Sequence, residues 1–171
     1  MVHTSTSHYA ADVAETRWLD EREERAWRGL MAMQDGLTEF LDRRLRTRCG
    51  LSGADFEVLA HLSEAPDGCL RPFVLGRSLG WEKSRLSQHL GRMERRGLVS
   101  RDRCPTDQRG AVVTITPHGR ELVEAAAPRH VADVREAVVD HLTPEELETL
   151  AAVSDTVRAR LAALDERRAE P

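Results

Sequence analysis

The spacing of apolar residues changes abruptly at Gly97. Before this glycine, Leu86, Leu90 and Met93 follow one another at steps of four and three residues, the period of a helix with one buried face. After it, residues 98–104 and 111–116 have the composition of β-strands, and residues 105–110 have that of a turn. Because glycine commonly ends a helix, we expect a helix from residue 81 or 82 to residue 96, followed by a β-hairpin.

Capping signals predict further helices on both sides of this segment. Ser52 with Asp55, and Thr143 with Glu146, have the spacing of N-terminal capping boxes. Prolines in first turns and glycines after last turns mark other boundaries. The expected helices cover residues 18–45, 53–64, 72–79, 117–138 and 144–164, with a break near Asp20 and a kink at Pro128. Residues 69–71 are expected to be a short extended piece.

This order of elements is typical of a winged helix-turn-helix. We expect a mainly α fold with a small β-hairpin wing (α+β), in which a winged helix-turn-helix is joined to a helical dimerisation region. The expected organisation is a disordered tail at 1–11, N-terminal helices at 12–50 on the dimerisation side, a DNA-binding lobe at 51–116, and C-terminal dimerisation helices at 117–167.

Positive charge is concentrated in the same part of the chain. Residues 71–110 hold ten basic and four acidic side chains, whereas the remainder holds 15 basic and 25 acidic ones, for a net charge of −4 overall. A basic region in an acidic protein favours a polyanionic partner, although charge alone is about equally consistent with an ordinary solvated face. Together with the order of elements, it indicates double-stranded DNA as the partner.

The helix over residues 81–96 turns polar groups away from its apolar side. Hydroxyls, an amide and guanidiniums on that face suit base edges and phosphates in a major groove. Gln88 suits adenine and Arg85 suits guanine, whereas His89, on a flank, is as consistent with packing as with DNA contact. The residues expected to contact DNA are Lys83, Ser84, Arg85, Ser87, Gln88, His89, Arg92, Arg95, Arg96, Arg101, Arg103, Asp107 and Arg109.

The hairpin is expected to contribute to the same interface. Its arginines suit a narrow minor groove, and Asp107 at the tip is expected to orient an arginine such as Arg109. A solvated hairpin with ordinary surface charges is the alternative. The basic helix that precedes the hairpin makes this alternative the weaker one.

Three motifs in order and in spacing resemble the MarR (multiple antibiotic resistance regulator) family of bacterial transcription factors. They are SRLSQHLGRMERRGLVSR at residues 84–101, DQRG at 107–110 and TPHGREL at 116–122, and the resemblance covers residues 51–122. It implies a homodimeric repressor on a pseudo-palindromic operator, released by a small phenolic or anionic effector or by thiol oxidation. The family's effector pocket lies beside the DNA-binding lobe, so Trp27, His61 and Arg71 are the candidate effector-binding residues by position.

The last helix supports a dimer independently of this resemblance. Leu147, Leu150, Val157, Leu161 and Leu164 fall near heptad spacing and form one apolar seam. A domain of this size has little remaining core to cover such a seam. A contact with a second copy around a two-fold axis would bury it.

Other classes of protein explain the sequence less well. An enzyme is not expected, because the chain has no glycine-rich phosphate loop and no HExxH, GxSxG or paired-carboxylate motif. A helical protein-interaction module would leave the basic helix and hairpin unexplained. Cys49, Cys69 and Cys104 are expected to be reduced and structural, with Cys49 and Cys104 as the candidates for a redox-sensing alternative. We expect no cofactor, no metal, no membrane partner and a cytoplasmic location.

Overall fold

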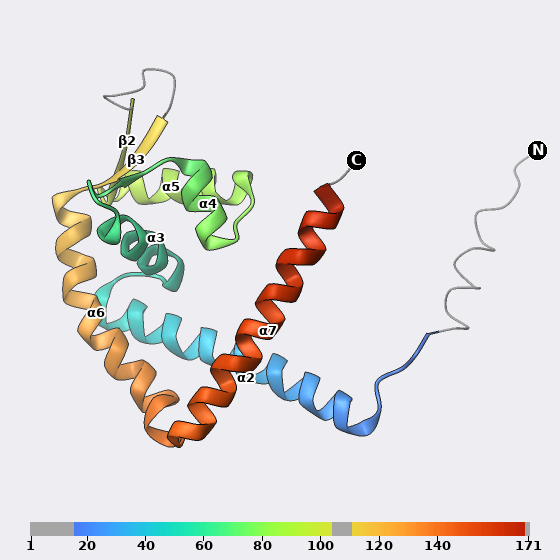
Figure 1. Ribbon diagram of the computed structural model, residues 1–171. Helices are drawn as coiled ribbons and strands as arrows, with labels where there is room; N and C mark the ends of the chain where they lie inside the picture. Colours follow the sequence, from blue (N-terminus) through green and yellow to red (C-terminus); the bar gives the residue numbers. More distant parts are fainter. Residues whose placement is uncertain (1–15, 104–110, 170–171) are drawn as a thin grey trace, which may run out of the picture. The chain divides into compact units, whose positions relative to one another are not determined.

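The computed structural model describes residues 16–103 and 111–169 (Figure 1). The described chain divides between Thr38 and Glu39 into two compact units. The first unit is helical, and the second contains every other element. The elements are α2 (Glu21–Cys49), α3 (Gly53–Glu64), β1 (Cys69–Leu70), α4 (Pro72–Leu79), α5 (Lys83–Arg95), β2 (Val99–Arg103), β3 (Ala111–Ile115), α6 (Pro117–Ala137), the short 3₁₀ helix η1 (Val139–His141) and α7 (Pro144–Ala169). The mainly α fold with a β-hairpin wing is therefore confirmed.

Local capping interactions set the helix boundaries. The Ser52 hydroxyl accepts a hydrogen bond from the Asp55 N–H, and the Asp55 carboxylate accepts one from the Ser52 N–H, as the capping box predicts. The Thr116 hydroxyl caps α6 in the same way by accepting from the Gly119 N–H. Gly80 and Gly97 adopt φ angles of 64° and 69°, so both end their helices in the left-handed conformation.

Two helix boundaries differ from those expected. The Asp20 carboxylate caps α2 by accepting from the N–H groups of Arg22 and Glu23, so the expected break near Asp20 is the start of the helix. The same helix continues to Cys49, four residues beyond the expected end. Pro128 lies inside α6, which continues through it to Ala137.

The sheet has three antiparallel strands in the order β1-β3-β2. The hairpin of β2 and β3 forms the wing, with Arg101 opposite Val113 and Ser100 opposite Thr114. On the other side of β3, Cys69 pairs with Thr114. The piece expected only to be extended is thus an edge strand, which ties the chain before α4 to the wing.

The core lies among α3, α4, α5, α6 and the sheet. Its fully buried side chains include Leu51, Val58, Leu59, Leu62, Leu75, Leu90, Met93, Leu98 and Val113. One close approach fixes how β2 meets α6: a Cβ on Gly119 would lie 2.1 Å from the Leu98 carbonyl oxygen. Only glycine fits there, and it lets the start of α6 rest against the start of the wing.

The apolar seam of α7 is open in the single chain. Leu147 and Leu150 are partly buried, whereas Val157, Leu161 and Leu164 expose 45%, 55% and 40% of their surface. Apolar side chains in contact with water are unfavourable by roughly 1.5–3 kcal/mol each relative to full burial. The residues that the structure describes therefore leave this part of the seam uncovered.

Candidate nucleic-acid interface

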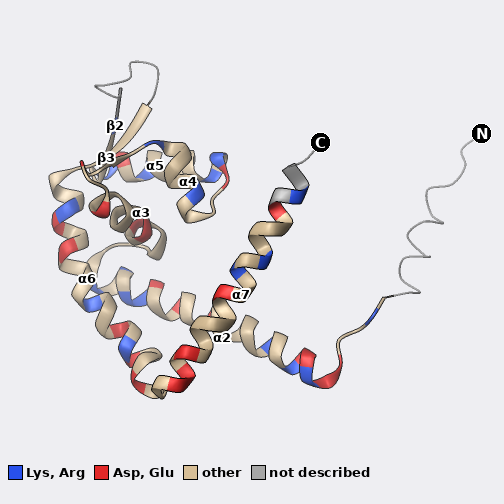
Figure 2. Cartoon of the chain, in the orientation of Figure 1, with Lys and Arg blue, Asp and Glu red and all other residues tan. Residues whose placement is uncertain are grey.

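The helix α5 presents a polar face and buries an apolar one, as its spacing predicts. Leu86, Leu90 and Met93 are between 0% and 3% exposed. The exposed side chains of α5 are Lys83, Ser84, Arg85, Ser87, Gln88, Arg92, Glu94 and Arg95, so one acidic group accompanies the basic and polar ones. Figure 2 shows basic segments along α5, while acidic residues gather where α6 ends and α7 begins.

A tight turn between α4 and α5 makes this presentation possible. Gly80 ends α4, and the Trp81 N–H then donates to the Gly76 carbonyl at 2.9 Å. A Cβ on Gly76 would lie 3.4 Å from Leu86 Cδ2, so the glycine allows α5 to pack closely on α4. Two helices joined in this way form a helix-turn-helix, of which α5 is the second, exposed helix.

Aromatic contact holds one of the exposed arginines. The Arg85 guanidinium carbon lies 4.4 Å from the centroid of the Trp81 ring, which is a cation–π arrangement. Trp81 is only partly exposed, and its ring meets the ring of His89 edge-on at 5.2 Å. Arg85 is therefore held in place at the start of α5, where its side chain is exposed to solvent.

The structure places His89 in the interior, so the expectation that it contacts DNA is corrected. The residue is only 7% exposed. Its Nδ1 atom lies 2.9 Å from Nη2 of Arg92, and its Nε2 atom lies 3.1 Å from Oδ1 of Asp55 on α3. The contact with Asp55 is close but less well aligned than a regular hydrogen bond. The helical period could not reveal this, because Asp55 lies on another helix.

Arg96 is also used internally. Its guanidinium donates to Asp55 Oδ2 at 2.6 Å and to the Gly50 carbonyl at 2.8 Å. These bonds tie the end of α5 to the start of α3. Arg96 therefore has a structural role, and its expected phosphate contact stays a prediction.

The Asp55 carboxylate contacts both His89 and Arg96. Burial by itself raises the pKa of this carboxyl, but the close contact with His89 and the hydrogen bonds from the Ser52 N–H and Arg96 together hold its pKa well below the usual range. Asp55 therefore remains an anion at neutral pH although it is buried. A buried negative charge without partners would destabilise the folded state, so Asp55 needs its contacts with His89, Ser52 and Arg96 together.

The described part of the wing includes one of the side chains that are expected to contact DNA. Arg101 on β2 donates to the Ser87 carbonyl at 2.6 Å and lies 3.8 Å from Glu94, so the wing is joined to α5. The Arg103 side chain, Cys104, Asp107 and Arg109 lie outside the described residues. Their expected roles stay predictions.

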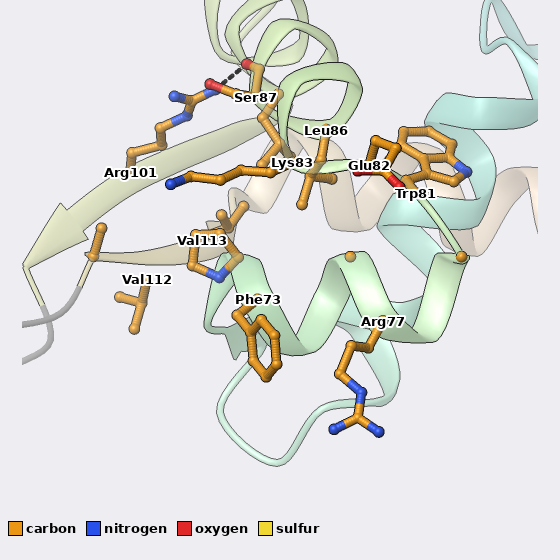
Figure 3. A pocket seen from close by; sticks show the side chains of 15 residues that line it. Phe73, Arg77, Trp81, Glu82, Lys83, Leu86, Ser87, Arg101, Val112 and Val113 are labelled. Carbon is orange, nitrogen blue, oxygen red and sulfur yellow. Dashed lines mark hydrogen bonds between the residues drawn. The ribbon is translucent and has the colours of Figure 1, made fainter. Parts of the chain in front are cut away.

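A cavity of about 720 Å³ lies between α4, α5 and the wing (Figure 3). Its walls are mainly apolar and include Phe73, Trp81, Leu86 and Val112. Lys83 reaches from α5 towards the wing, and the Arg101 guanidinium lies beside Ser87. The sequence alone did not reveal this cavity, because its walls come from segments that are brought together by the sheet.

The three candidate effector residues do not line this cavity. Trp27 lies on α2 in the first unit and is 53% exposed. His61 lies on α3, where its Nδ1 atom is 2.9 Å from the Glu57 carbonyl oxygen, and Arg71 precedes α4. Cys49 and Cys69 are free thiols and partly buried.

Membrane and metal sites were sought in the same part of the chain. Across residues 16–103 and 111–169, no helix has both the length and the apolar character needed to cross a bilayer. The same residues hold no cluster of three or more His, Cys, Asp or Glu side chains suited to a metal ion.

Comparison with known proteins places these features in a family. A model described as MarR family matches residues 50–110. The multiple antibiotic resistance protein MarR of Salmonella typhimurium is 30% identical over 100 residues, which cover 58% of this chain and 68% of that protein.

Solved structures agree with this match over most of the chain. AbsC, a MarR family transcriptional regulator from Streptomyces coelicolor, has a TM-score of 0.82 and 37% identity, covering 86% of this chain and 99% of its own. Sco3205 from the same organism, solved in complex with DNA, has a TM-score of 0.80 and 36% identity, covering 84% of this chain and 90% of its own.

Proposed function

The chain belongs to the MarR family of transcriptional regulators, and we propose that it acts as a homodimeric repressor on a pseudo-palindromic operator, released by a small-molecule effector. The observation that carries the proposal is the exposed polar face of α5, which lies opposite three fully packed apolar side chains. A helix docked through such a stripe offers its other face to a major groove.

The exposed side chains divide by chemistry into two groups. The Gln88 amide suits bidentate pairing with adenine, and the Arg85 guanidinium suits guanine. Arg92 and Arg95, further along α5, suit phosphates, which fix orientation without reading sequence. That Sco3205 was solved in complex with DNA supports DNA as the partner.

A homodimer is supported by the open seam on α7. Burying the exposed side chains of Val157, Leu161 and Leu164 against a second copy removes an unfavourable apolar surface. A two-fold dimer would present two copies of α5 about 34 Å apart, which is one turn of DNA. A repressor then acts by occupying its operator until an effector changes this spacing.

The cavity between α4, α5 and the wing supports an effector site better than Trp27, His61 and Arg71 do. Its apolar walls suit an aromatic or aliphatic body, and Lys83 and Arg101 suit an anionic group. Because residues of both α5 and the wing line the cavity, a ligand there would act directly on the DNA-binding surface. We therefore propose an apolar carboxylate as the class of effector.

This part of the proposal is tested by ligand binding without DNA. In a chain carrying Trp18→Phe and Trp27→Phe, the remaining tryptophan is Trp81, which lines the cavity. Benzoate should change the fluorescence of Trp81 in a saturable way, and Lys83→Ala should weaken that binding. An unchanged spectrum at millimolar benzoate would exclude this class of ligand from the cavity.

DNA binding is tested by selection from a randomised pool of 30-base-pair duplexes. We expect the wild-type protein to recover an inverted repeat and to bind it with a Kd that rises steeply with salt, because each phosphate contact releases condensed counterions. Fluorescence anisotropy against a scrambled duplex measures the preference. Equal, salt-insensitive affinity for both duplexes would contradict the proposal.

A further inference from the structure

His89 connects the interior of the lobe to the DNA-facing side of α5. Its imidazole is buried, yet it touches the side chains of Asp55 on α3, Arg92 one turn further along α5, and Trp81 before α5. Packing alone does not require a histidine here, because the neighbouring buried positions of α5 are filled by leucine and methionine.

The partners of His89 favour one tautomer of its imidazole. Asp55 is an anion whose oxygens only accept hydrogen bonds, and Arg92 is a cation whose nitrogens only donate. The imidazole must therefore carry its proton on Nε2, facing Asp55, and offer the lone pair of Nδ1 to Arg92 at 2.9 Å. In this tautomer, the imidazole links the buried Asp55 carboxylate to the exposed Arg92 guanidinium.

We propose that His89 is a positioning residue for DNA binding, which holds the Arg92 guanidinium in its DNA-facing conformation before DNA arrives. The inference rests on the proposed function, in which Arg92 contacts phosphate. An arginine that is free in solution loses side-chain entropy when a phosphate immobilises it. An arginine already held by His89 has less to lose, so the same contact yields a tighter complex.

The ring of His89 extends this effect towards the start of α5. It meets Trp81 edge-on at 5.2 Å, and Trp81 in turn carries the Arg85 guanidinium on its face at 4.4 Å. Arg92 is therefore held directly, by a hydrogen bond, and Arg85 indirectly, through an aromatic ring. The direct link is the sharper one to test.

A double-mutant cycle measures the link between His89 and Arg92. The Kd of a 30-base-pair duplex selected by the wild-type protein is compared for wild type, His89→Leu, Arg92→Ala and the double variant. We expect Arg92→Ala to weaken binding about tenfold in the wild-type background but less than about threefold when His89 is already leucine. His89→Leu alone should weaken binding without changing the salt slope, whereas Arg92→Ala should lower that slope by about one.

Three further variants keep the test decisive. His89→Gln keeps both a donor and an acceptor and should restore most of the coupling, whereas His89→Met fills the same space without an acceptor nitrogen and should behave as His89→Leu does. His141→Leu is the control for replacing a histidine outside α5, because the Nε2 atom of His141 in η1 lies 2.9 Å from the Glu136 carbonyl oxygen. Thermal unfolding confirms that each variant is folded before its Kd is used.

The possible failures point to different conclusions. If the wild type does not bind DNA, or Arg92→Ala leaves its Kd and salt slope unchanged, then the proposed function of Arg92 fails and this inference fails with it. If Arg92→Ala weakens binding equally in both backgrounds, or His89→Gln and His89→Leu are indistinguishable, then the inference alone is overturned.

Discussion

The guanidinium groups of α5 differ in what holds them. Arg96 is bound to Asp55 and Gly50, Arg92 to His89, and Arg85 lies on Trp81. Arg95 has no hydrogen-bond or ion-pair partner among the residues that the structure describes. These arginines are thus suited to different roles: Arg96 stabilises the fold, whereas the Arg95 guanidinium is available to bind an anion.

The division between base reading and phosphate contact gives a first prediction. Gln88→Ala or Arg85→Ala should cost about 1–3 kcal/mol on the selected duplex and much less on a scrambled one, because base contacts exist only on the right sequence. Arg92→Ala should weaken binding to both duplexes alike. Anisotropy titrations on the two duplexes measure this, and equal losses for Gln88→Ala on both would show that α5 docks in another way.

The buried carboxylate of Asp55 gives a second prediction. Its pKa is held below the ordinary value of about 3.9, so the folded state binds fewer protons than the unfolded state in acid. The stabilisation is fully present above that ordinary pKa and is lost as pH falls through the lower, folded value. Asp55→Asn should therefore be less stable than wild type at pH 6, and the difference should shrink below about pH 4.

Urea unfolding at a series of pH values from 6 to 3 measures this difference. A constant gap between wild type and Asp55→Asn over the whole range would mean that the carboxyl is not selectively ionised in the folded state.

The burial of a side chain could be predicted from the sequence where it depends only on the spacing of residues along one helix. The buried side of α5 followed from the spacing of Leu86, Leu90 and Met93. The roles of His89 and Arg96 did not, because both depend on Asp55, which lies 34 and 41 positions earlier in the chain. Contacts at that separation are set by how helices pack, which one sequence does not show.

Among the elements, the junction of β2 and α6 is the most tightly constrained. The third prediction is that Gly119→Ala is destabilised by at least about 1–3 kcal/mol, because the new Cβ would overlap the Leu98 carbonyl and force the backbone apart. Gly36→Ala on α2 is the matched control. Nothing lies within 4 Å of its new Cβ, so it should be neutral or up to about 1 kcal/mol more stable.

Thermal and urea unfolding of both variants test this prediction. A Gly119→Ala protein as stable as wild type would show that the wing and α6 are not held together as closely as described. Wing and helix are also joined by Thr116, whose hydroxyl donates to the Gly97 carbonyl at 2.7 Å.

Most elements could be predicted, because caps and turns act locally. Ser52, Thr116, Gly80 and Gly97 mark boundaries in the sequence as they do in the structure. The pairing of β1 with β3 could not be predicted, since Cys69 meets Thr114 across 45 positions of sequence. The cavity was missed for the same reason: β3 closes it against α4 and α5.

For the whole molecule, the proposed homodimer depends on the exposed apolar seam of α7. The fourth prediction is that Leu161→Glu becomes monomeric and loses operator binding, because a glutamate in a two-fold interface would be buried without a partner. Asp165→Asn on the same helix is the control and should remain dimeric. Sedimentation measures the assembly, and a Leu161→Glu dimer with normal DNA binding would place the interface elsewhere.

The seam itself was evident from the sequence, whereas its partner was not. Leu147, Leu150, Val157, Leu161 and Leu164 show the heptad-like spacing of a packed helix. The single chain leaves the last three exposed. Spacing shows that a surface must be buried but does not identify what buries it.

The central claim is that a dimer of this chain reads two half-sites with its two α5 helices. Hydroxyl-radical footprinting on a duplex recovered by selection tests it most directly. We expect two protected segments on one face of the DNA, centred about 10–10.5 base pairs apart, both lost in Leu161→Glu. A single protected segment, or two that persist in that variant, would contradict the account.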